Sequence, residues 1–349
     1  MTFHSERLQV GMTRLVIDLQ HPEAVLENLR RAAMARPEDL ALHLVYSDAL
    51  SDAGDPLGEL IQRQCVDPET EIPEAMSRQV LGALHGHAVG WRIVRGFLRE
   101  VRLKRTSPRE LRQLVGRPEW DGVTALSFAR GATVRTQRLP DLEIFDLISH
   151  PMCSGLREVT DLDDETLRRV ADVSRSFDRL GVQLHPLRDG LFGPVMLWAK
   201  VLKLSHGNNS IEWMLGAGRP LLERVEALEL ADKGPDPLML LHDAGERLTS
   251  IEAPHVSATR VGLRWRVILT PARFTEHSVY WDVPQLVAAV RAVAARLASL
   301  EIRMPDYGPA VLDRIRLAAR DVDFNLVLTG PAAQLVSSLY TDADADSPF

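Results

Sequence analysis

Two groups of acidic residues are the first candidates for chemistry, because several carboxylates close together can hold a divalent cation. The groups are Asp48, Asp52, Asp55 and Glu59, and Asp161, Asp163, Asp164 and Glu165. Both fall where helices are expected to end or begin, and caps and acidic first turns account for carboxylates at such places. The sequence therefore favours capping and solvated charge over a metal site.

The motifs of common catalytic and nucleotide-binding sites are missing. The chain contains no Gly-x-x-x-x-Gly-Lys-Ser/Thr loop, no His-Glu-x-x-His and no Gly-x-Ser-x-Gly, so no phosphate cradle, zinc pair or exposed nucleophile is indicated. His85 and His87 are the closest histidines, but a separation of two points them to different sides of a strand or helix. We predict no catalytic residue, no cofactor and no metal, and hence a protein that is not an enzyme.

Composition limits the remaining classes. The length of 349 residues exceeds what one compact core usually organises, and sparse aromatic residues (5%) leave the core to aliphatic side chains. A net charge of −7 gives no global attraction for nucleic acid or anionic membrane. Cys65 and Cys153 are far apart and form no Cys-x-x-Cys motif, and no stretch approaches the roughly 18 apolar residues of a membrane span. We expect a cytoplasmic protein with reduced thiols.

Helical patterns occupy the first part of the chain. Apolar residues recur at helical spacing from Pro22 to about Ala35, and Pro37 then starts a second helix that Gly54 should end. Asp55 and Pro56 can begin a third helix. The buried stripe of the second helix is expected to be Leu40, Leu44, Val45 and Ala49.

This module resembles the bacterial repeat-companion domain. The segments that carry the resemblance are Leu44–Leu50 and Gly54–Gln64, followed by Trp91 and Arg95-Gly96-Phe97, which leads into a strand. The chain departs from the usual wording of the family at Ser47, Ala49, Leu57 and Leu60. The resemblance covers roughly residues 22 to 104. It implies a helical companion to a repeat array, often leucine-rich, and carries no catalytic role.

A repeated apolar pattern follows the module. An apolar residue is followed by others at +3 and +5, with successive starts about 21 to 33 residues apart, which is broadly the spacing of leucine-rich repeats. The matches start at Leu98, Val123, Phe177, Val225, Leu248 and Leu297, and weaker ones start at Leu156, Ala199 and Asp323. A longer gap before Leu297 indicates an insertion with an extra strand at Leu263–Leu269, and a tenth strand near Val279–Trp281.

Helix-like segments between these strands predict an α/β fold with parallel strands joined by crossovers. The full expectation is an N-terminal helical module plus an irregular leucine-rich-repeat-like β/α solenoid with a curved parallel sheet. The expected parts are an extension (1–20), the module and linker (21–95), the solenoid (96–332, with the insertion near 256–282) and an acidic tail (333–349). A doubly wound or closed α/β enzyme would show the same alternation, but charged residues interrupt these strands.

A repeat surface without a catalytic constellation predicts a scaffold that binds a protein partner through the side chains flanking the buried positions. The candidate residues are Arg102, Lys104, Lys203, Glu229, Glu252, Tyr280, Trp281, Glu301 and Arg303. Two alternatives stay open: an enzyme whose site is assembled only in three dimensions, and RNA binding through Arg99, Arg102, Lys104, Arg105 and Arg109. Nucleic acid is the minority hypothesis, no membrane is expected, and the oligomeric state and the partner's identity are open.

Overall fold

The structure is a computed structural model. It describes residues 22–104, 106–129, 141–183, 195–205, 219–231, 236–270, 283–303 and 325–329, together with Met214 and Leu317. By spatial contacts the chain divides into two compact units: unit 1 comprises residues 1–134 and 146–156, and unit 2 comprises residues 135–145 and 157–349. Each unit is described separately below.

Unit 1 begins with four helices and continues with strands. The helices are α1 (Pro22–Ala35), α2 (Leu40–Asp52), α3 (Leu57–Val66) and α4 (Glu74–Leu81), followed by the short helix η1 (Gly82–Leu84). The later elements are β1 (Ala88–Val94), β2 (Phe97–Leu103), α5 (Pro108–Leu114), η2 (Pro118–Trp120), β3 (Ala125–Phe128) and η3 (Pro151–Cys153). Helix α6 (Asp141–Ser149) crosses the division between the units. The predicted helices are therefore present, and the predicted strand at Leu98–Leu103 is β2.

The predicted buried stripe of α2 is wrong at three of its four positions, whereas Ala49 is partly buried against the core. Leu40, Leu44 and Val45 are 43%, 40% and 41% exposed. The buried side of the helix is formed instead by Leu42, His43, Tyr46, Ser47 and Leu50. Because α2 is apolar on nearly every side, spacing alone could not say which side α1, α3 and Phe97 would cover.

A tight hairpin joins the helices to the sheet of unit 1. Strands β1 and β2 are antiparallel, and Arg95 and Gly96 between them both have positive φ, at 50° and 78°, as a two-residue hairpin turn requires. The buried side chain of Gln64 on α3 donates to the Ile93 carbonyl (3.1 Å) and accepts from the Gly96 amide (3.0 Å). A Cβ on Gly96 would lie 2.7 Å from Ile61. The Arg95-Gly96-Phe97 segment is thus a turn clamped by α3.

Unit 2 is built from strands and short helices. Its strands are β4 (Glu158–Asp163), β5 (Ser176–Gln183), β6 (Trp198–Ser205), β7 (Val225–Leu230), β8 (Ser250–Ala253), β9 (Val256–Val261), β10 (Arg264–Leu269), β11 (Leu297–Arg303) and β12 (Asn325–Thr329). Its helices are α7 (Asp164–Val170), α9 (Arg219–Leu222), η4 (Asp236–Met239), α10 (Leu240–Asp243), α11 (Val283–Val293) and η5 (Ala294–Arg296). The strands lie side by side in chain order from β4 to β12, so unit 2 is an α/β structure.

The +3/+5 pattern located the strands correctly. All nine predicted matches fall on strands β2 to β8, β11 and β12. In β6, for example, Leu202 and Leu204 are buried, as expected for the +3 and +5 positions. Burial departs from the pattern in β8, where Ala253 at the +5 position is half-buried, and in β4, where Asp161 has a φ of 62° and the register shifts between Val159 and Leu162. This irregularity turns Leu162, rather than the expected Asp161, into the core.

The predicted extra strand at Leu263–Leu269 is confirmed as β10, but the expectation of purely parallel strands is not. Strand β9 was not predicted, and it pairs antiparallel with both β8 and β10. Gly262, with a φ of 63°, lies in the tight turn between β9 and β10. Such a turn permits antiparallel neighbours, whereas parallel ones need a crossover. The predicted strand at Val279–Trp281 lies outside the described residues.

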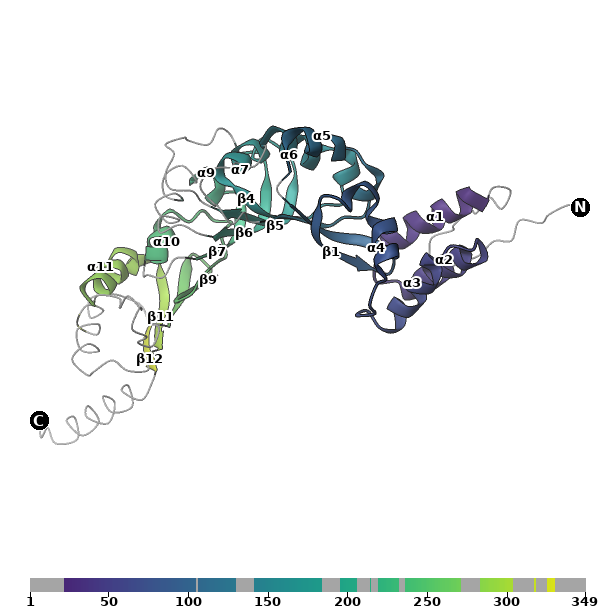
Figure 1. The fold of residues 1–349 in the computed structure, drawn as a ribbon. Helices are drawn as coiled ribbons and strands as arrows, with labels where there is room; N and C mark the ends of the chain where they lie inside the picture. Colours follow the sequence, from purple (N-terminus) through teal and green to yellow (C-terminus); the bar gives the residue numbers. More distant parts are fainter. Residues whose placement is uncertain are drawn as a thin grey trace, which may run out of the picture. The chain divides into compact units, whose positions relative to one another are not determined.

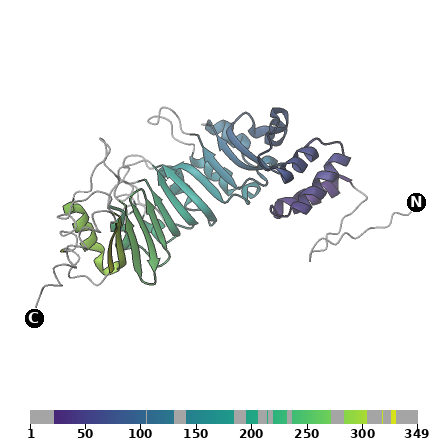
Figure 2. The same ribbon diagram turned by 90° about the horizontal axis from the view of Figure 1, so that it is seen from below.

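The described helices of unit 2 lie on one face of its sheet (Figure 1). Figure 2 looks onto the other face, where no described element covers the strands. The buried aliphatic residues point toward the helices, and the residues between them along each strand form the uncovered face. This uncovered side of β5 to β11 is called the open face below.

Candidate interaction surface

Strand pairing brings three candidate residues side by side on the open face. Lys203 on β6 is the register partner of Glu229 on β7, and Glu229 is that of Glu252 on β8. Lys203 and Glu252 are exposed, and Glu229 is half-buried. Because paired positions on adjacent strands have Cβ atoms about 5 Å apart, these side chains form one continuous row. The sequence thus identified true neighbours.

Small side chains form a second row beside the first. Register pairing aligns Val201, Ala227, Ser250 and Thr259 across β6, β7, β8 and β9. None of these four side chains is long enough to project above the neighbouring row of Lys203, Glu229 and Glu252. The open face therefore combines a row of long charged side chains with a row of short side chains. Side chains of a partner can pack over the short ones.

Glu229, a candidate binding residue, is engaged in an ion pair. Arg179 on β5 reaches across β6 and forms an ion pair with the Glu229 carboxylate. Arg179 is the register partner of Val201 on β6, and Val201 is that of Ala227 on β7. The ion pair cancels the charge of Glu229, so the centre of the row is closer to neutral than its residue types imply.

The other predicted acidic residues also have local partners. The Ser257 hydroxyl on β9 donates to the Glu252 carboxylate (2.7 Å), and the Arg303 guanidinium donates to the Glu301 carboxylate (2.8 Å). Glu301 is separated from Glu252 by the inserted strands β9 and β10, whose register partners at this level are Ser257 and Ile268. The acidic residues therefore do not form one continuous patch.

The remaining candidates divide between unit 1 and the undescribed part of the chain. Arg102 and Lys104 are exposed on β2 in unit 1. Arg99 of the proposed RNA-binding run is instead engaged, because its guanidinium donates to the Gly122 carbonyl (3.2 Å) and lies 5.4 Å from the Phe97 ring centroid. Burial lowers the pKa of Arg99. Tyr280, Trp281 and Arg105 lie outside the described residues.

Sequence reasoning missed a group of three residues at the edge where the strands of unit 2 begin. Trp198, Arg224 and Arg247 each stand immediately before the first buried residue of a repeat, which is Ala199, Val225 or Leu248. The guanidinium carbons of Arg224 and Arg247 lie 4.4 Å and 4.0 Å from the centroid of the Trp198 ring. The signal in the sequence is a tryptophan or an arginine at the position before the first residue of each of these three +3/+5 matches.

A small ion-pair network lies next to this group. The Asp178 carboxylate contacts the Lys200 ammonium at 2.6 Å and the Arg157 guanidinium at 3.6 Å. The hydrogen bond from Lys200 is the main cause that lowers the pKa of Asp178. The three residues come from the starts of β4, β5 and β6, so the network ties consecutive strands together. All three are solvent-accessible, and such pairs contribute little to stability.

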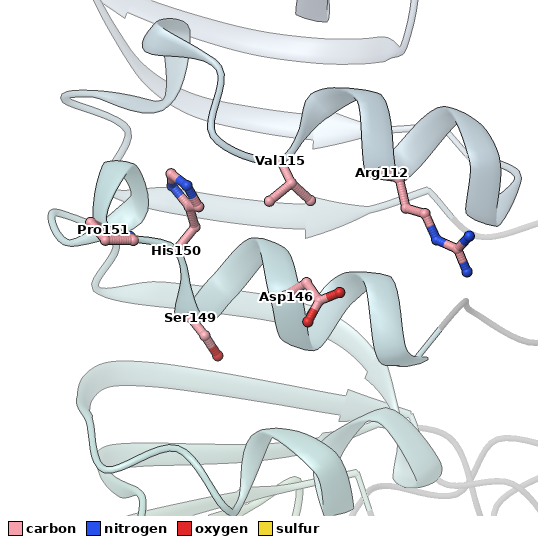
Figure 3. A pocket seen from close by; sticks show the side chains of 6 residues that line it. All are labelled: Arg112, Val115, Asp146, Ser149, His150 and Pro151. Carbon is pink, nitrogen blue, oxygen red and sulfur yellow. The ribbon is translucent and has the colours of Figure 1, made fainter.

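A surface hollow of about 460 Å³ lies between α5 and α6 in unit 1. Its lining consists of Arg112, Val115, Asp146, Ser149, His150 and Pro151. Figure 3 shows Arg112 and His150 at opposite ends, with Val115 between them. The Met152 amide donates to His150 Nδ1 (3.1 Å), which assigns this ring a role in capping η3. The polar groups do not converge on one point, as a catalytic site requires.

Two residues of the acidic groups cap helices, whereas Asp48 and Asp161 accept from the side-chain amides of Gln62 and Gln183 (3.0 Å and 2.9 Å). Asp163 accepts from the Thr166 amide (2.7 Å) at the start of α7, and Asp55 accepts from the Leu57 amide (2.9 Å) before α3. Within the described ranges, no three histidine, cysteine or acidic residues are grouped as a metal site needs. Nor does any helix in those ranges have the length and apolar character to cross a membrane.

Comparison with known proteins adds no relative: no family model matches the chain, and neither a curated protein nor a solved structure is significantly similar to it.

Proposed function

We propose that this chain is a non-enzymatic scaffold of the cytoplasm, in which an irregular leucine-rich-repeat-like solenoid binds a protein partner through the open face of unit 2. The chain order of the strands and the +3/+5 burial support the repeat architecture. A continuous outer face made of equivalent positions from successive repeats is the feature that such proteins use for binding.

The row Lys203–Glu229–Glu252 is the observation that carries the proposal. Residues from three successive strands stand in register there, and they present a cation, an ion-paired carboxylate and a second carboxylate. The shorter side chains of Val201, Ala227 and Ser250 lie beside them. A polyanion would meet carboxylates along this path, whereas a protein surface can supply both signs of charge. The row therefore supports a protein partner over a nucleic acid.

The test exchanges the two outer charges of the row. A partner is first obtained by native purification of the chain, identified by mass spectrometry and purified separately. Its affinity is then measured for the unaltered chain, for the double variant Lys203→Glu with Glu252→Lys, and for Arg291→Glu. The double variant keeps the net charge, and Arg291 is exposed on α11, on the helix-covered side of the sheet.

We expect the exchanged pair to weaken binding by about tenfold or more, since like charges would then face each other across the interface. Arg291→Glu should bind as the unaltered chain does. Equal affinities for all three chains would remove the open face from consideration. Equal losses in both altered chains would show that only long-range charge matters.

A further inference from the structure

Arg224 and Arg247, at the edge where the strands of unit 2 begin, contact an aromatic ring and not a carboxylate. Arg224 and Arg247 both lie within 4.4 Å of the centroid of one tryptophan ring, that of Trp198. Among the described residues, that ring is the sole interaction partner of either guanidinium. By contrast, Lys200 on the same strand as Trp198 is paired with Asp178. The edge thus contains two cations that no described anion neutralises.

This arrangement suits the recognition of carboxylates. Contact with an aromatic ring orders a guanidinium through its face and leaves the N–H groups in its plane free to donate. Holding two like charges near one ring costs energy, and a bound anion removes that cost. Each guanidinium can therefore donate two parallel hydrogen bonds to one carboxylate, and this bidentate pairing is among the strongest that arginine forms.

We propose that Trp198, Arg224 and Arg247 form a binding site for an acidic segment of a partner protein, in which two neighbouring carboxylates each bind one arginine. This inference rests on the proposed function in one respect, namely that the partner is a protein. Glu226 on β7 and Glu252 on β8 lie farther along the same strands and are exposed. They would repel a continuous phosphate chain along these strands more than a short peptide that carries few charges.

The site is tested on the full chain with a defined probe. The probe is a fluorescent peptide, Gly-Ser-Asp-Ala-Asp-Ala-Asp-Ser-Gly, whose alternate aspartates lie on one side of an extended backbone about 7 Å apart. The same peptide with asparagine in place of aspartate serves as its control. Binding is measured by fluorescence anisotropy for the unaltered chain and for two double variants. Arg224→Gln with Arg247→Gln removes the site, and Arg291→Gln with Arg296→Gln removes the same charge from exposed positions elsewhere in unit 2.

We expect saturable binding of the aspartate peptide that falls by about tenfold or more only in the Arg224/Arg247 variant, because each lost guanidinium removes charge-assisted hydrogen bonds. The variant with lysine at both positions should bind with intermediate strength, since it keeps charge but loses the bidentate geometry. The open-face variant Lys203→Glu with Glu252→Lys should still bind the aspartate peptide saturably, because Arg224 and Arg247 are unaltered, which separates this test from that of the proposed function.

Three results would overturn the inference. The first is absence of binding, or an equal loss in the two glutamine variants. The second is tighter binding of a single-stranded oligonucleotide that also depends on Arg224 and Arg247, which would assign the site to nucleic acid. The third is stronger peptide binding after Asp342, Asp344 and Asp346 are changed to asparagine, which would make the chain's own acidic segment the occupant.

Discussion

Arg179 on β5 forms an ion pair with Glu229 on β7, and thus spans the intervening strand β6. The contact couples two strands that are not direct neighbours in the sheet. It also fixes the charge pattern of the open face, because Glu229 is the central residue of the row Lys203–Glu229–Glu252. A partner that approaches this row meets a neutral pair at its centre.

The energy of this pair can be measured with a double-mutant cycle of Arg179→Gln and Glu229→Gln. Both side chains are about one-third exposed (32% and 33%), so we expect a coupling energy of about 0.5–1 kcal/mol. The measurement is urea unfolding of the four chains, repeated at high salt, which should reduce the coupling. Additive effects of the two substitutions at low salt would show that the pair does not contribute to stability.

Loss of the Gln64 amide should destabilise unit 1 strongly. Gln64→Leu leaves the buried Ile93 carbonyl and the Gly96 amide without their partner, and we expect a loss of about 2–4 kcal/mol in the free energy of unfolding. Gln62→Leu on the same helix is the control, because the Gln62 amide contacts only the exposed Asp48 carboxylate. Its cost should stay below about 1 kcal/mol. Similar losses in both variants would contradict the clamp on the β1–β2 turn.

Gly58 should not tolerate a side chain, although it lies in a helix. A Cβ there would be 2.6 Å from the Ser47 carbonyl oxygen and 2.9 Å from the Ser51 amide nitrogen, both backbone atoms of α2. Gly58→Ala would gain about 1 kcal/mol of helix propensity, yet we expect a net loss of about 1–3 kcal/mol because α2 and α3 must separate. The measurement is thermal unfolding of Gly58→Ala. Gly86→Ala is the control, because a Cβ at Gly86 meets nothing within 4 Å. A stabilised Gly58→Ala chain would be the contrary outcome.

Unit 1 should lose stability as the pH falls below about 6.5. His43 is 1% exposed, and neither of its ring nitrogens has a hydrogen bond. Burial is the main cause that lowers the pKa of His43 below its usual value of 6.5, and the nearby Arg95 lowers it further. The Pro37 carbonyl and Asp39 favour the protonated ring but are outweighed. Because the unfolded chain then binds the proton more readily, acid shifts the equilibrium toward unfolding.

The variant His43→Phe isolates this effect. A phenyl ring preserves the packing against Phe97, which lies 5.7 Å away between ring centroids, and it cannot be protonated. The urea midpoint of the unaltered chain should fall more between pH 7 and pH 5 than that of the variant. Parallel pH profiles would mean that His43 does not control the acid sensitivity of unit 1.

The positions of most strands could be predicted from the sequence, although β9 was not predicted. The +3/+5 spacing is a consequence of burying one side of each strand against helices, so Leu202, Leu204 and their equivalents mark strands without further information. Helix capping is similarly local. The Asp163 carboxylate accepts from the backbone amide of Thr166, three residues away, and the residue types at the start of a helix predict such a cap.

Only the tertiary structure decided which side chains meet across strands. Arg179 and Glu229 are 50 residues apart in the chain, and no local rule selects that pair. The buried side of α2 depended in the same way on Phe97, and the contact of Arg224 and Arg247 with Trp198 depended on the register of three strands. Residue type and spacing specify local backbone conformation, whereas these contacts arise from packing between segments that are distant in sequence. The positions that form the open face could therefore be predicted from the sequence, but its charge pattern and the contacts at its edge could not.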